Sequence, residues 1–162
     1  MSNATTSPMP SRILMIATYV VGFVGAYFGF QSLGNGDGLA LSAILAVGVT
    51  GVISFVRHAI YNRSDAVNGG WDYGAVNKFQ IEVGLANLAW GVFAILAVGL
   101  NWGQKAIAAS FLISGFYFAS VAIFIIVTRD FKNRKIGGLI GIAIWAAVMI
   151  WIGWGAMAQA SV

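Results

Sequence analysis

The chain contains five separate apolar runs, each long enough to cross a lipid bilayer as a helix. They cover about residues 13–33, 39–56, 79–100, 106–128 and 136–158. A helix rises about 1.5 Å per residue, so about 20 apolar residues cross the hydrocarbon core of a membrane. The sequence therefore predicts an all-α fold, an integral membrane helical bundle of five transmembrane helices.

The composition agrees with this prediction. Of the 162 residues, 59% are apolar and only 9% are charged, whereas soluble domains contain about 25% charged residues. A chain of this length is expected to form one domain. We place the transmembrane bundle at residues 12–160, after a cytoplasmic N-terminal tail at residues 1–11.

The positive charges indicate how the bundle is oriented. If the N-terminus is cytoplasmic, that side carries eight of the nine Lys and Arg residues, and the other side carries Lys105 alone. Short cytoplasmic loops are enriched in Lys and Arg, so we expect the N-terminus inside and the C-terminus outside. The eight residues are Arg12, Arg57, Arg63, Lys78, Arg129, Lys132, Arg134 and Lys135.

Residue counts exclude several kinds of site. The chain has no Cys, which excludes a disulfide, a thiolate nucleophile and a Cys-ligated cluster. Its single His excludes bis-histidine haem ligation and a multi-His zinc site within one subunit. No metal, cofactor or catalytic residue is indicated, and the scattered basic residues do not form the patch that nucleic-acid binding requires.

Four polar residues are candidates for function at the cytoplasmic side of the spans. Glu82 lies about one turn inside the third span, where an ionisable residue suggests function; the alternative is a structural tie to Arg57 or His58. Arg57 and His58 end the second span, and a lone His at a boundary is either a satisfied polar residue or a proton carrier. Asn87 lies deeper and is expected to bond another helix.

The longest connection, residues 62–77, is rich in polar residues and also contains Asp65. Long loops often carry function, but a segment held at the membrane interface is an equal alternative. The candidates at this connection and the start of the next span are Trp71, Asp72 and Gln80.

Small residues recur at the spacing of closely packed helices. In lipid, small residues let helix backbones approach each other, so they mark expected contacts. We expect packing within the bundle, with a contact between subunits at Gly25 and Gly29 as the alternative. The helix-packing candidates are Gly25, Gly29, Gly84, Gly91, Gly137 and Gly141.

One stretch carries a family resemblance. Gly70-Trp71, followed by residues 79–88 with the sequence FQIEVGLANL, resembles a family of small bacterial multi-pass membrane proteins of unknown function in the neighbourhood of DoxX-like proteins. The resemblance implies a bacterial inner (plasma) membrane, and it implies no activity. It marks as family features Trp71, Gln80, Glu82, Gly84 and Asn87.

Three functions follow from these patterns. The first is a non-catalytic structural or accessory subunit that sits in the lipid bilayer and forms a homo-oligomer or joins a larger membrane complex. The second is a small-molecule or ion/proton pathway that uses Glu82, His58 and Asn87. The third is a membrane-embedded enzyme of the glutathione-transferase type, suggested by the polar residues between Arg57 and Asn62.

Overall fold

The computed structural model describes residues 6–35, 37–70, 78–128 and 136–160 of the chain. Five helices in these ranges are long and apolar enough to cross a membrane, and none of the described residues forms a strand. The predicted all-α bundle with five potential spans is therefore confirmed. The spans run over Met9–Gly34, Leu39–Ile60, Lys78–Gly99, Gln104–Thr128 and Ile136–Gln159.

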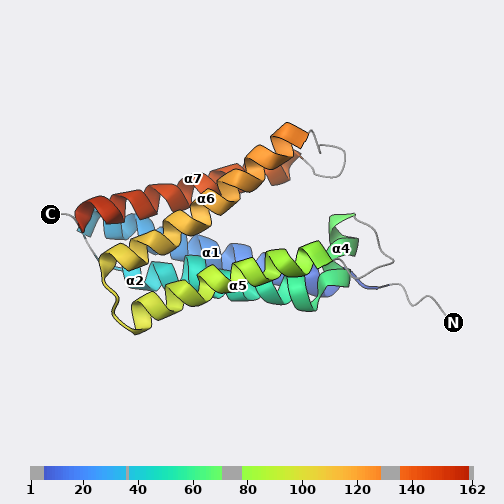
Figure 1. Cartoon of the computed structure of the whole chain (residues 1–162), viewed down its shortest axis with the longest axis horizontal. Helices are drawn as coiled ribbons and strands as arrows, with labels where there is room; N and C mark the ends of the chain where they lie inside the picture. The colour runs from blue at the N-terminus through green and yellow to red at the C-terminus, as the bar shows by residue number, and fades with distance from the viewer. Residues whose placement is uncertain (1–5, 36, 71–77, 129–135, 161–162) are drawn as a thin grey trace.

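The five helices run back and forth along one long axis (Figure 1). The first is α1 (Met9–Asn35), and the last three are α5 (Lys78–Gly99), α6 (Gln104–Thr128) and α7 (Ile136–Gln159). Because the number of long helices is odd, α1 begins and α7 ends at opposite ends of the bundle. The span boundaries predicted from the sequence lie within about four residues of the observed helix ends.

The second span is one continuous helix that alternates between two geometries. It consists of α2 (Leu39–Ser42), the π-helical η1 (Ala43–Val49), α3 (Thr50–Phe55) and the π-helical η2 (Val56–Ile60). A π-helix has a wider turn than an α-helix and occurs mostly as single turns inserted into longer helices, frequently at functional sites. The predicted end of this span at residue 56 is too early, because Arg57 and His58 belong to the final π-helical segment.

A short polar helix follows where the sequence favours a loop. It is α4 (Asn62–Gly69), which lies at the end of the bundle where α1 begins (Figure 1). Gly70 follows it with a φ of 75°, a left-handed conformation that glycine adopts readily and that commonly ends helices. We call this end of the molecule the α4 end.

Glycines bring the second span and α5 into backbone contact. A Cβ atom added to Gly51 would lie 2.6 Å from the carbonyl oxygen of Asn87 and 2.9 Å from Cα of Gly91. A Cβ on Gly91 would lie 2.9 Å from the oxygen of Gly48. Only glycine allows two helices to approach this closely, so these positions set the distance between the spans.

The Gly25 and Gly29 face packs inside the bundle. A Cβ on Gly25 would collide with the backbone nitrogen of Ala46, and one on Gly29 would lie 2.6 Å from Ile152 Cδ1 and 2.7 Å from Ser42 Oγ. This face therefore contacts the second span and α7 of the same chain. The alternative of a subunit contact at these two glycines is wrong.

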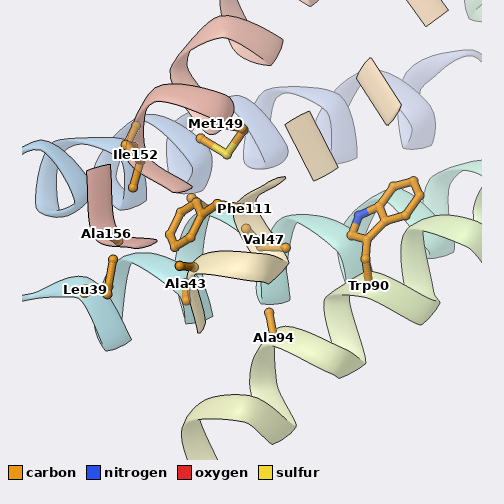
Figure 2. Close-up of a cluster of buried hydrophobic side chains, with 12 residues drawn as sticks. Leu39, Ala43, Val47, Trp90, Ala94, Phe111, Met149, Ile152 and Ala156 are labelled. Atoms are coloured by element: carbon orange, nitrogen blue, oxygen red, sulfur yellow. The ribbon is translucent and has the colours of Figure 1, made fainter. Parts of the chain in front are cut away.

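Larger side chains fill the space where α6 and α7 meet the second span. Figure 2 shows the ring of Phe111 between Ala43 and Val47 on one side and Met149 and Ile152 on the other. Phe111, Met149 and Ile152 are fully buried. The small residues of the second span leave the room that these side chains occupy.

The outward faces of the long helices are apolar, as a helix surrounded by lipid requires. On α1, Ile13, Ile16 and Phe23 are each more than half exposed. Gly137 and Gly141 of α7 also face outward, and a Cβ at either would meet nothing within 4 Å. Among the residues that the structure describes, nothing packs against these two glycines, which contradicts the expectation that they pack within the bundle.

Candidate functional site

The α4 end holds a buried acidic residue, Asp65. It lies in the first turn of α4, where the partial positive charge of a helix N-terminus favours a carboxylate. Its relative exposure is 5%, and a buried charge is costly unless other groups pair with it. The partners of Asp65 therefore define the site.

Four side chains surround the Asp65 carboxylate. Its Oδ1 accepts a hydrogen bond of 2.6 Å from Ser11 Oγ and lies 3.4 Å from Nε of Arg57 in an ion pair. Its Oδ2 lies 2.8 Å from His58 Nδ1 and accepts a hydrogen bond of 2.8 Å from Gln80 Nε2. We call these five residues the Asp65 cluster. They come from α1, η2, α4 and α5, so the cluster joins three membrane spans to the short helix.

The surroundings of Asp65 favour its charged form. Burial by itself raises the pKa of a carboxyl group. The hydrogen bond from His58, the positive charge of Arg57, the positive charge that His58 carries when protonated, and the hydrogen bond from Ser11 outweigh burial and hold the pKa of Asp65 below its ordinary value. Asp65 is therefore an ionised carboxylate at neutral pH. The negative charge of Asp65 offsets the positive charge of the adjacent Arg57 guanidinium.

Further hydrogen bonds fasten α1 to α4 beside the cluster. Ser64 Oγ accepts a hydrogen bond of 3.1 Å from the backbone N–H of Ser11. That N–H lies in the first turn of α1, where backbone donors have no partner within the helix. Arg12 Nε donates to Asn68 Oδ1 over 2.9 Å. Because α4 supplies acceptors for the start of α1, the two segments form one unit.

Gly84 lets α5 come close enough to place Gln80. A Cβ on Gly84 would lie 3.0 Å from the backbone nitrogen of Ala59 and 3.3 Å from Cβ of His58. Gln80 lies one helical turn earlier on the same face of α5 and is only 1% exposed. A Cβ at position 84 would crowd this contact, so glycine at this position allows α5 and the end of the second span to lie close together.

The structure brings three of the residues selected from the sequence into one site and leaves others out. Arg57, His58 and Gln80 meet at Asp65. Glu82 is exposed, and among the described residues it has no hydrogen bond or ion pair. The expectation that Glu82 pairs with Arg57 or His58 is wrong, because α4 folds over the end of the second span and provides Asp65 instead.

Asn87 is buried but does not join the cluster. Its Nδ2 donates to the carbonyl oxygen of Val83 over 2.7 Å, one turn earlier in its own helix. The hydrogen bond expected between helices is thus made within α5, while the backbone of Asn87 contacts Gly51. Trp71 and Asp72 lie outside the described residues.

Asp65 is the functional candidate that sequence reasoning missed. In the sequence, Asp65 is only one of several polar residues in the connection 62–77, which is expected to be a loop. Its spacing from His58, seven residues with a helix end between them, matches no motif that predicts a contact. Hydrogen bonds and an ion pair hold the cluster together. Among the described residues no group of three or more His, Asp or Glu side chains could hold a metal ion.

Comparison with known proteins places the chain in a family without assigning an activity. The model of a family of unknown function, DUF6790, matches residues 12–161, and the chain belongs to this family. No curated protein and no solved structure matches the chain.

Proposed function

We propose that this member of DUF6790 is a non-catalytic membrane subunit that assembles with itself or with a larger complex in a bacterial inner membrane. The proposal includes the orientation expected from the charges, with the α4 end in the cytoplasm. It is supported by five helices able to span a membrane and by a polar site whose groups are directed at each other.

The observation that carries the proposal is the saturation of Asp65. Its two oxygens contact four side chains of the same chain. A carboxylate acting as a general base needs one oxygen within reach of the proton it removes, and here both oxygens already have partners. The arrangement suits a residue that fixes the ends of α1, the second span and α5 in a single geometry.

The proton or ion pathway is the second candidate, and the contact between His58 and Asp65 favours it. Nδ1 of His58 and Oδ2 of Asp65 lie 2.8 Å apart, within the hydrogen-bond reach that a proton relay requires. The other two residues expected on this path do not extend it, since Glu82 faces outward and Asn87 bonds within α5. This candidate therefore rests on one pair of residues.

The glutathione-transferase hypothesis receives less support. Arg57 and His58 are directed to Asp65, and Asn62 Nδ2 donates to the oxygen of Ala59 over 2.8 Å. These three side chains would have to leave their partners to bind a tripeptide thiol.

Purification from the native membrane in a mild detergent, followed by mass spectrometry of the intact assembly, tests the proposal. We expect a homo-oligomer or a reproducible membrane partner. The matched control is proton flux in proteoliposomes of the purified chain, which a subunit without a pathway does not increase. A monomer that binds no partner and conducts protons would overturn the proposal in favour of the second candidate.

A further inference from the structure

The imidazole of His58 lies between a cation and an anion, with one ring nitrogen directed at each. Nε2 is 2.6 Å from Nη2 of Arg57, and Nδ1 is 2.8 Å from Oδ2 of Asp65. A guanidinium nitrogen can only donate a hydrogen bond. Nε2 must therefore accept, which leaves the single ring proton of a neutral imidazole on Nδ1, where it is donated to Asp65.

This arrangement tolerates only one protonation state of His58. When the ring gains a second proton, both nitrogens become donors. Nε2–H would then point at an N–H of Arg57, and two positive charges would share the same short contact. Asp65 does not relieve the conflict by taking the proton, because its surroundings keep it ionised.

Protonation would also remove the need for Arg57 in the cluster. A charged imidazole donates to Asp65 from Nδ1 and supplies the positive charge that the buried carboxylate requires. Arg57 would keep only the longer contact of its Nε, 3.4 Å from Oδ1. We propose that His58 is a pH-dependent switch that, on gaining its second ring proton, replaces Arg57 as the counter-charge of Asp65 and releases the Arg57 guanidinium from the cluster.

Among the residues that the structure describes, the elements packed against His58 contribute the following groups to its surroundings. From α4 the ring meets Asp65, and Arg63 of α4 is exposed. From α5 the cluster receives the neutral amide of Gln80, while Lys78 and Glu82 are exposed. From α1 it receives the hydroxyl of Ser11, and Arg12 is bonded to Asn68 instead.

Both partners are close enough to water for the exchange to occur. The side chains of His58 and Arg57 are 14% and 17% exposed. A proton can therefore reach the ring from the α4 end, and the guanidinium can move outward without crossing the core. The switch goes beyond the proposed subunit function and does not depend on which partner the chain binds.

The chain has one His, so nuclear magnetic resonance of protein labelled with ¹⁵N in His and Arg, reconstituted in lipid nanodiscs, reads the site directly. At neutral pH we expect the ring to carry its proton on Nδ1 and the Arg57 side-chain signals to show slow exchange with water. On acidification the Arg57 signals should enter fast exchange over the same pH interval in which the ring becomes doubly protonated. A ring protonated on Nε2 at neutral pH would overturn the proposal. Arg57 signals that do not change through the His58 titration would do the same.

Two variants of His58 separate the effect of protonating His58 from other effects of low pH on the protein. His58→Gln keeps an acceptor oxygen and a donor nitrogen that do not titrate, so Arg57 should stay protected across the whole pH range. His58→Lys offers donors only, so Arg57 should exchange rapidly already at neutral pH. Release of Arg57 on acidification in the Gln variant would refute the switch, and if the Lys variant does not fold, the wild-type titration and the Gln variant still decide.

Discussion

Ser11 and Asp65 lie 54 positions apart in the chain and share a hydrogen bond of 2.6 Å between Oγ and Oδ1. This bond joins the first turn of α1 to the first turn of α4, across two complete spans. The Asp65 cluster, the exposed position of Glu82, the glycine contacts and the distribution of charges lead to five predictions.

The first concerns the role of Asp65 in stability. Asp65→Ala leaves Arg57, His58 and Gln80 without their acceptor, and removing one member of a buried charged pair costs about 3 to 5 kcal/mol. Asp65→Asn keeps one acceptor oxygen and should be destabilised less. Thermal unfolding in one detergent measures both variants. If the Ala variant unfolds at the wild-type temperature, the cluster does not hold the α4 end together.

The second concerns the pH dependence of that stability. The folded chain holds the pKa of Asp65 below its ordinary value, so in acid the unfolded chain takes up a proton before the folded chain does. The stabilisation from Asp65 is therefore present above the ordinary carboxyl pKa of about 3.9 and is lost as the pH falls through the lower folded value. The difference in unfolding temperature between wild type and Asp65→Asn should shrink from pH 6 to pH 3. A constant difference would contradict this.

The third concerns Glu82. Because this side chain is exposed and no described residue pairs with it, Glu82→Gln and Glu82→Ala should both unfold within about 0.5 kcal/mol of wild type, as surface substitutions usually do. The same unfolding assay measures them beside Asp65→Ala. A large loss of stability for the Ala variant alone would restore Glu82 as a structural tie.

The fourth ranks the glycines by what a methyl group would meet. Gly51→Ala places Cβ against the backbone of α5, and such overpacking costs about 1 to 3 kcal/mol. Gly141→Ala meets nothing within 4 Å and gains helix propensity, so it should be neutral or slightly stabilising. Equal effects of the two substitutions, measured by unfolding temperature, would show that Gly51 is not at a close helix crossing.

The fifth tests the orientation in the membrane. The chain has no Cys, so single-Cys variants report without background. Asp37→Cys and Gln104→Cys should react with an impermeant maleimide from outside, and Arg63→Cys only after permeabilisation, since all three positions are exposed. Ser64 would be a poor reporter because it is 3% exposed. Labelling of positions 37 and 63 from the same side would exclude the proposed topology.

The five spans could be predicted from sequence because an apolar run of about 20 residues has few alternatives to crossing a membrane. The site could be predicted only in part. Arg57, His58 and Gln80 stood out as polar residues at span ends. Asp65 did not, because its burial depends on α4 folding back against α1, a tertiary contact between segments that carry no periodic pattern.

The π-helical turns are a second feature that the sequence did not reveal. Nothing in the composition of Ala43–Val49 or Val56–Ile60 distinguishes a π-helix from an α-helix. In Val56–Ile60, the polar pair Arg57 and His58 predicts the end of the span. With Asp65 as a partner, the helix continues through both residues.

The bond between Ser11 and Asp65 also has a consequence for how the chain is made. During synthesis Ser11 emerges 54 residues before Asp65, and Gln80 emerges 15 residues after it. In the proposed topology, Ser11 and Asp65 lie on the same side of the bilayer once the first two helices have both crossed it. The Asp65 carboxylate remains hydrated until the Gln80 amide, at the start of α5, is synthesised and can bind it. If only one of these two helices crosses the bilayer, Ser11 and Asp65 lie on opposite sides and cannot form their hydrogen bond. The bond therefore forms only when α1 and the second span are inserted as a pair.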